Sequence, residues 1–468
     1  MESIPIPPAK LLSSKSHIVP GPLVVTELFF EVPLDYADLS AGHIVLFARR
    51  AVKHEVPVCP PDEPPAVKPY MVFLEGGPGF GNREPQDSTL TWPALARGYQ
   101  VLLLDHRGVG LSTPVSADML RLIPGGPAAH ARYLRLMRQD NTVRDCEAVR
   151  KCLTHDWPKP KAKWSIFGQS YGGFVSLSYL SLHPEGLREV FLTGGLAPVG
   201  KSPEDVYRAT FGRVTQRNKV YYAKYPEDVA AVHQIASHIA NKGGSIPLPA
   251  GGTLTVARLL TLGLAFGVHG GLDKVHAVIL HLKTSLDQFG FLTRASLAPL
   301  ETATTFDTNI IYAIIHEAIY CDGPGAASNW AAFRVGQDLE LFSWLKSPYK
   351  PSESTSEPLY FSGEMVFPLH FETYPELMLL KDVAEMLATM DDWPHLYDQA
   401  QLRRNQVPVY AASYIDDMYV DFNFASETAG LVKGTKVFAT NVMYHNALRV
   451  KADEIFQQLF SLRDDVID

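Results

Sequence analysis

The chain has 468 residues, 46% of them hydrophobic and 20% charged, which is typical of a globular protein with a large core. The formal net charge of −8 argues against nucleic acid as the main partner, because phosphate backbones require a basic surface. The four cysteines are scattered and include no C-x-x-C pair, which argues against a disulfide framework and a zinc motif. They are Cys59, Cys146, Cys152 and Cys321.

The N-terminal stretch MESIPIPPAKLLSSKSHIVPG lacks the continuous apolar segment of a signal peptide. The longest apolar stretch, LLTLGLAFGVHGGL from Leu259, is too short and too rich in glycine to span a bilayer. The chain also contains no N-x-S/T glycosylation sequon. We therefore expect a cytoplasmic protein that does not bind a membrane.

Short apolar or β-branched runs, several followed by glycine-rich turns, predict the strands of a sheet. Their continuous apolar character is typical of a parallel sheet covered by helices on both faces. A helical pattern lies between two of them, in NTVRDCEAVRKCL from Asn141. The alternation predicts an α/β fold with a mostly parallel central sheet. The predicted strands occupy residues 44–52, 71–77, 101–108, 165–170, 190–196, 359–364, 407–415 and 436–441.

Residues 198–357 interrupt this rhythm with mostly helical patterns, one of which begins at Ser202 and Asp205 with the spacing of a capping box. A helical block inserted between strands is most simply a cap over the carboxyl edge of the sheet, where ligands bind. We therefore predict a helical cap domain at 198–357 and a catalytic domain made of 1–197 and 358–468. The proline-rich residues 57–68 are predicted to form a surface loop.

A serine stands between two glycines in Gly168-Gln-Ser170-Tyr-Gly172, after a predicted strand and before a helix. This G-x-S-x-G pattern is typical of a nucleophile elbow, in which a sharp turn lifts the serine hydroxyl clear of the sheet. The pattern alone fits an ordinary serine in a tight turn equally well. Its meaning therefore depends on the rest of the chain.

Two further motifs follow predicted strands. LEGGPGFG, from Leu74 to Gly81, can present backbone N–H groups to a developing oxyanion, with a second donor from Tyr171 after the nucleophile. The alternative is a plain glycine-proline turn. LLLDHRGVGLS contains Asp105 and Arg107, which we expect to brace adjoining loops as an ion pair rather than to take part in chemistry.

A nucleophilic serine needs a base, and the base needs an orienting carboxylate. In the α/β-hydrolase order, the acid and then the histidine follow the serine at the ends of later strands. The strand at 407–415 runs into three candidate acids, Asp416, Asp417 and Asp421, and the strand at 436–441 precedes His445. This order predicts a Ser-His-Asp triad.

The motifs GGPG, DHRGVGLS, GQSYGG and YIDDMYVDF with the late histidine together resemble the proline iminopeptidases, serine peptidases of the α/β-hydrolase fold. The resemblance is to the larger branch of that family and covers nearly the whole chain. It implies Ser170 as nucleophile, His445 as base and Asp417 as triad acid, with Asp416 and Asp421 as rivals. It implies the amides of Gly77 and Tyr171 as oxyanion donors.

The family motif HGGPG has Glu75 in place of its histidine here, which leaves the role of this side chain open. The resemblance also points to Glu317 and Glu364 as the carboxylates that hold the substrate amine, whereas most glutamates are solvated surface acids. The implied substrates are peptides with a free N-terminal proline, and hydroxyproline and alanine remain open. HEAIY resembles a zinc motif, but Tyr320 stands where H-E-x-x-H requires histidine, so we expect no metal and no cofactor.

Three alternatives remain at this point. The chain could be a dipeptidyl or tripeptidyl aminopeptidase or an esterase of the same fold. An epoxide hydrolase is disfavoured, because that class carries an aspartate nucleophile where this chain has Ser170. A non-catalytic binding protein on the same fold is the alternative from another class. Oligomeric state stays open.

Overall fold

The computed structural model describes residues 4–55, 67–303, 306–351 and 357–465. Its main sheet has nine strands in the order β1-β2-β3-β5-β4-β6-β7-β10-β11. The first three strands join β5 through antiparallel pairs, and the strands from β5 to β11 are parallel to one another. The predicted α/β fold with a mostly parallel sheet is therefore confirmed. The strands are β1 (Lys10–Val19), β2 (Leu23–Pro33), β3 (His43–Lys53), β4 (Tyr70–Leu74), β5 (Gln100–Leu104), β6 (Trp164–Gln169), β7 (Leu187–Thr193), β10 (Val409–Tyr414) and β11 (Thr435–Thr440).

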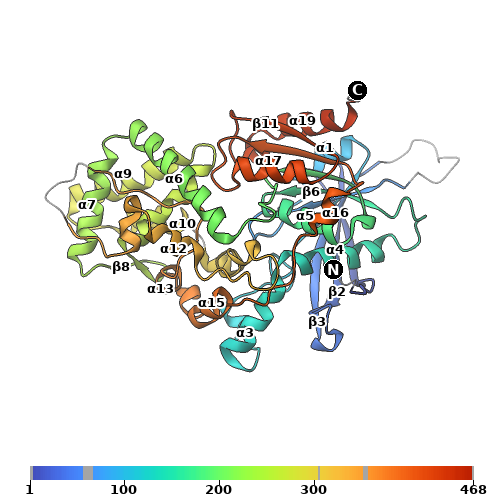
Figure 1. Cartoon of the computed structure of the whole chain (residues 1–468), viewed down its shortest axis with the longest axis horizontal. Coiled ribbons are helices and arrows are strands. Elements are labelled where there is room, and N and C mark those ends of the chain that lie inside the picture. The colour runs from blue at the N-terminus through green and yellow to red at the C-terminus, as the bar shows by residue number, and fades with distance from the viewer. Residues whose placement is uncertain (1–3, 56–66, 304–305, 352–356, 466–468) are drawn as a thin grey trace.

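Alternate residues of the parallel strands enter different cores, as the pleat of a strand requires. On one face, Val72 and Ile166 join a core that contains α4 (Gln139–Leu153) and α5 (Tyr171–Leu182). On the other face, Phe73 and Phe167 join a core with α1 (Thr91–Ala96) and α19 (Ala452–Asp464). Helices thus cover both faces of the sheet (Figure 1).

All but one of the predicted strands are present, and the exception is the run at 359–364, which is not a strand. Its backbone groups pair with side chains and with the carbonyl of Leu260 instead of a neighbouring strand. Asn218 brackets Phe361 with two hydrogen bonds of 2.8 Å, and Trp344 Nε1 donates to the carbonyl of Tyr360. An apolar run satisfied in this way cannot be distinguished from a strand by its sequence. The hairpin of β1 and β2 was not predicted, because β1 is mostly exposed and polar.

Between β7 and β10 the chain leaves the sheet and forms a largely helical segment (left half of Figure 1). It opens with α6, where Ser202 and Asp205 form the predicted capping box. The two-stranded pair β8 (Ile246–Pro247) and β9 (Thr253–Leu254) also belongs to this segment. The boundary predicted at residue 357 stays a prediction. The principal helices are α6 (Pro203–Lys224), α7 (Asp228–Asn241), α9 (Gly271–Phe289), α10 (Arg294–Ala303), α11 (Ile310–Ile314), α12 (Ala331–Gln337) and α15 (Lys381–Ala388).

Among the helices that the structure describes, none combines the length and apolar character needed to cross a membrane. Cys146, Cys152 and Cys321 are free thiols, and Cys59 lies outside the described residues. Most of the predicted surface loop at 57–68 also lies outside them.

Candidate active site

Ser170 sits in the turn between β6 and α5 with a backbone φ of 53°, a conformation that L-residues rarely adopt. The neighbouring glycines leave room for this turn. A Cβ on Gly168 would lie 2.5 Å from the carbonyl oxygen of Gly172, and one on Gly172 would lie 1.9 Å from that of Leu74. Only glycine fits at these two positions, so the strained turn has the geometry of a nucleophile elbow.

The structure brings Ser170, His445 and Asp417 together from three separate parts of the chain. His445 Nε2 lies 2.8 Å from Ser170 Oγ, and His445 Nδ1 lies 2.8 Å from Asp417 Oδ2. All three side chains are buried. Burial lowers the pKa of His445, but the Asp417 carboxylate and the charge of Glu364 raise it, and the net pKa lies above the usual value.

Asp417 is held in place by its own loop. Its Oδ1 accepts hydrogen bonds from the amides of Tyr419, at 2.8 Å, and Val420, at 3.1 Å. The rival acids make other contacts: Asp416 is exposed with Oδ1 3.6 Å from Arg213, and Asp421 accepts bonds from the first amides of α17 (Phe422–Leu431). Of the three candidates, Asp417 alone bonds His445.

The GGPG loop packs directly on the elbow. A Cβ on Gly76 would lie 2.4 Å from Gln169 Oε1 and 3.0 Å from Ser170 Cβ. Within the described residues, the amides of Gly77 and Tyr171 make no hydrogen bond. Both N–H groups are therefore unpaired among these residues, and their role as oxyanion donors stays a prediction.

The predicted ion pair between Asp105 and Arg107 is wrong. Arg107 points into the core and forms a two-pronged ion pair with Asp145 of α4, with N–O distances of 2.6 and 2.7 Å. Asp105 instead accepts hydrogen bonds from the amides of Asn82, at 2.7 Å, and Leu111, at 3.0 Å. The nearby amides satisfy the carboxylate of Asp105, and Asp145 neutralises the buried guanidinium.

Glu364 is the last residue of the run at 359–364, which was predicted as a strand and is not one. Its Oε1 accepts a hydrogen bond of 2.7 Å from the hydroxyl of Tyr312 in α11. Burial raises the pKa of its carboxyl, and the charge of His445 opposes that rise. Glu364 therefore lies within electrostatic range of the triad.

Glu317 lies between α11 and the short 3-10 helix η6 (Ala318–Tyr320). Its Oε1 and Oε2 accept hydrogen bonds from the amides of Ala332 and Ala331, at the start of α12. Burial raises its pKa to about 7, although these amides oppose the rise. The carboxyl thus changes charge near neutral pH.

Known proteins are similar in sequence to most of this chain. A model of the α/β hydrolase fold matches residues 69–233. The proline iminopeptidase aneH of Aspergillus aculeatus is 40% identical over 463 residues, which cover 99% of each chain. The proline iminopeptidase of Aeromonas sobria is 38% identical over 457 residues, which cover 97% of this chain and all of the relative.

This chain belongs to the proline iminopeptidase family. It is therefore a hydrolase of the α/β-hydrolase fold, and as a peptidase it acts on peptides. A shorter member, from Neisseria gonorrhoeae, matches at 30% identity over only 26% of this chain. Among solved structures, a 2-hydroxy-6-oxo-6-phenylhexa-2,4-dienoate hydrolase from Rhodococcus sp. covers 97% of this chain and all of its own, with 13% identity and a TM-score of 0.40.

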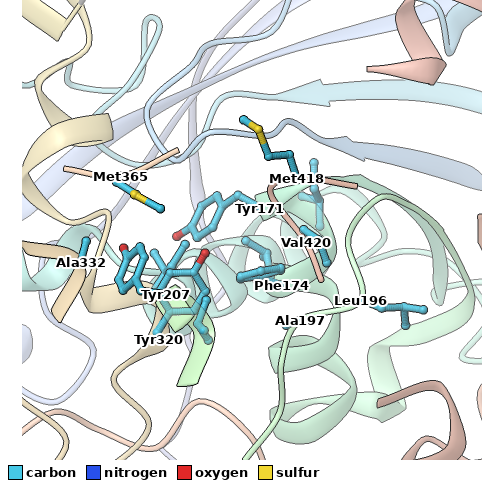
Figure 2. Close-up of a cluster of buried hydrophobic side chains, with 14 of the residues drawn as sticks. Tyr171, Phe174, Leu196, Ala197, Tyr207, Tyr320, Ala332, Met365, Met418 and Val420 are labelled. Carbon is cyan, nitrogen blue, oxygen red and sulfur yellow. The ribbon is translucent and has the colours of Figure 1, made fainter. Parts of the chain in front are cut away.

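In this proline iminopeptidase family member, buried aromatic side chains join the elbow helix to the inserted helices. Figure 2 shows Tyr207 of α6 and Tyr320 of η6 beside Tyr171 and Phe174 of α5. The ring of Tyr320 lies 5.9 Å from that of Tyr207 and 6.0 Å from that of Phe174. Burial raises the pKa of Tyr207, and the charges of Glu317 and Glu364 raise it further. Tyr207 thus lies close enough to both carboxyls to interact electrostatically with them.

Sequence reasoning missed two residues that contact the site. Tyr312 bonds Glu364, and Tyr419 donates its amide to Asp417 and packs its ring edge-on against His445, 4.7 Å between centroids. Tyr419 lies two residues after Asp417, so its position could have suggested a contact with the acid. No signal in the sequence pairs Tyr312 with Glu364.

One group of described residues has the composition of a cation site. Ligand atoms of Glu227, Asp228 and His276 lie within 4.8 Å of one another. Asp228 Oδ2 already accepts hydrogen bonds from Tyr221 and from His276 Nδ1. These residues belong to α7, α9 and the turn before α7, and to none of the elements that carry Ser170, His445 or Asp417.

Proposed function

We propose that this protein is a serine aminopeptidase that releases N-terminal proline from peptides. The observation that carries the proposal is the hydrogen-bonded chain from Ser170 through His445 to Asp417, in a member of the proline iminopeptidase family. A buried serine in a strained turn, bonded to an oriented imidazole, has the geometry of an activated nucleophile. Specificity for proline, as against hydroxyproline or alanine, is the finer part of this proposal.

The reaction begins with attack on the first carbonyl. His445 Nε2 accepts the proton of Ser170 as its oxygen bonds the carbonyl carbon, and Asp417 stabilises the resulting imidazolium. The amides of Gly77 and Tyr171 stabilise the negative oxygen of the tetrahedral intermediate. His445 then donates its proton to the leaving amine, and water, deprotonated by His445, releases proline from Ser170.

Recognition of the free amine is assigned to Glu317 and Glu364. The ammonium of the substrate would favour the ionised form of both carboxyls, whose pKa values are raised by burial when the site holds no cation. Residues 198–357 act as the cap that carries Glu317, Tyr207 and Tyr320 to this site. The aromatic rings around Tyr320 supply apolar surface for a proline ring.

A panel of aminoacyl fluorogenic substrates, each with a free and with a blocked amine, tests this function. We expect cleavage of the free prolyl substrate and loss of cleavage when its amine is blocked. Indifference to the blocked amine would favour the other hydrolases of this fold. A protein that forms no adduct at Ser170 with an organophosphonate would instead be a non-catalytic binder.

A further inference from the structure

The buried carboxylate of Glu75 joins two loops of the site. Glu75 follows β4, and its Oε1 accepts hydrogen bonds of 2.8 Å from the amide of Gly76 and 2.9 Å from Arg449 Nη2. The Glu75 side chain is 5% exposed, so its charge has little solvent to stabilise it. The Arg449 guanidinium provides that stabilisation.

The two partners of Glu75 belong to two different loops near the proposed reaction centre. Gly76, which bonds Glu75, precedes the proposed oxyanion donor Gly77 and packs against Ser170 Cβ. Arg449 lies four residues after His445, in the short helix α18 (Ala447–Val450). The bridge therefore connects the loop of the oxyanion donor to the loop of the base.

Arg449 also affects the pKa of His445. The carboxylates of Asp417 and Glu364 raise the pKa of His445, whereas burial and the positive charge of Arg449 lower it. The ring of Tyr419, which is neutral near physiological pH, packs against the imidazole on another side. Among the described residues, Arg449 is the cation that opposes the two carboxylates, and Glu75 partly neutralises it.

We propose that the Glu75–Arg449 bridge is a positioning device that holds the loop of the Gly77 amide and the loop of His445 in place at the elbow. The proposal rests on the reaction proposed above. It assigns a role to the glutamate that replaces the histidine of the family motif HGGPG. Neither residue bonds Ser170, Asp417 or His445, so both act through other groups.

The variants Glu75→Gln, Arg449→Met and Arg449→Lys test the bridge on a prolyl substrate and on a simple ester. Because misplacing an oxyanion donor costs up to about 100-fold, we expect Glu75→Gln and Arg449→Met each to lower kcat about 10- to 100-fold with little change in KM. Arg449→Lys should recover part of the loss. The double variant should be no worse than the worse single one, since the two residues act as one unit.

The pH profiles give a readout that a merely structural role would not move. His445 must be neutral to act as a base, so its pKa sets the acid limb of kcat/KM. Arg449→Met removes a positive charge, so the pKa of His445 rises and the limb moves to higher pH. Glu75→Gln leaves Arg449 without its counter-charge, so the limb moves to lower pH. The rate of Ser170 labelling by an organophosphonate, measured against pH, reports the same group without any substrate.

Two matched controls define the baseline. Lys451→Met removes a cation of nearly equal exposure, 37% against 36% for Arg449, from the ion pair with Glu454. Glu84→Gln removes the partner of Arg49, whose ion pair measures 2.7 Å. Both controls should keep wild-type kcat and the wild-type acid limb.

The proposal would be overturned if the acid limbs of Arg449→Met and Glu75→Gln moved in the same direction. It would also be overturned if all three variants kept the wild-type kcat and the wild-type acid limb. If one of these two charge-removing variants, Arg449→Met or Glu75→Gln, fails to fold, shown by its melting temperature, the labelling profile of the other carries the test. A wild-type protein that hydrolyses the ester but does not cleave the prolyl substrate would contradict the proposed specificity. The bridge would still be tested by the ester and the labelling profiles.

Discussion

The hydroxyl of Tyr312 donates a hydrogen bond of 2.7 Å to Glu364 Oε1 and so ties α11 to the extended run that leads back to the sheet. The bond lowers the pKa of the Glu364 carboxyl, against the burial that raises it. The Tyr312 hydroxyl thus holds one oxygen of a half-buried carboxylate near His445.

The first prediction concerns this pair. Glu364→Gln removes the charge that would bind the substrate ammonium, and a charged hydrogen bond contributes about 1.5–3 kcal/mol, so kcat/KM for prolyl substrates should fall at least about 10-fold. Tyr312→Phe should cause a smaller loss of the same kind, because it raises the pKa of Glu364. Hydrolysis of a simple ester should change little in both variants. The exposed Glu372→Gln serves as control, and equal losses on ester and prolyl substrate would contradict the assignment.

The second prediction concerns the pH dependence of substrate binding through Glu317. Its pKa of about 7 means that the carboxyl is neutral below that pH and ionised above it. Kinetics from about pH 5 to about pH 9 should therefore show KM for prolyl substrates rising as the pH falls below 7, beyond any change seen with the ester. Glu317→Gln should have the same KM across this range. A wild-type KM that does not vary with pH would refute the role of Glu317.

The raised pKa of the Glu317 carboxyl also leads to a prediction about stability. Its pKa in the folded protein is raised from 4.5 to about 7, so its contribution is fully present below 4.5 and is lost as the pH rises through 7. A shift of this size corresponds to about 3 kcal/mol. Urea unfolding should show that Glu317→Gln gains about this much stability relative to wild type between about pH 4.5 and about pH 8. A constant difference between the two proteins would mean that the carboxyl ionises as freely in the fold as in the unfolded chain.

Mutations can distinguish the proposed triad acid, Asp417, from its neighbour in the sequence, Asp416. Asp417→Asn should lower kcat by about four orders of magnitude, because the amide favours the wrong tautomer of His445. Asp416→Asn should remain within about two-fold of wild type, since a surface ion pair such as that with Arg213 contributes little. The measurement is kcat on a prolyl substrate, and the reverse order would move the acid by one residue.

The close packing around Gly172 in the elbow leads to a prediction about stability. Gly172→Ala places a Cβ 1.9 Å from the carbonyl oxygen of Leu74, where backbone must move, so we expect a loss of about 3 kcal/mol, the upper end of the usual cost of overpacking. Gly212→Ala, in α6 with open space around its Cβ, should instead gain up to about 1 kcal/mol. Thermal melts of the two variants provide the comparison, and equal melting temperatures would show that the elbow relaxes without cost.

Much of the sheet and the order of the proposed triad could be predicted from local signals. Buried parallel strands are continuous apolar runs, and the glycines around Ser170 record a turn that has no room for a side chain. The run at 359–364 has the same apolar character, yet it is no strand, because Asn218 and Trp344 supply its hydrogen bonds from distant elements. A local pattern cannot reveal such partners.

The sequence by itself determined the α/β class, the elbow at Ser170 and the place of His445 after the last strand, because each depends on short-range periodicity and on chain order. Only the tertiary structure decided that Asp417 faces His445 while Asp416 faces solvent, that Arg107 pairs with Asp145, and that Glu75 meets Arg449. These choices depend on side-chain direction and on contacts between residues far apart in the chain. Charge and burial at such contacts arise when the loops pack together, so they are properties of the folded molecule.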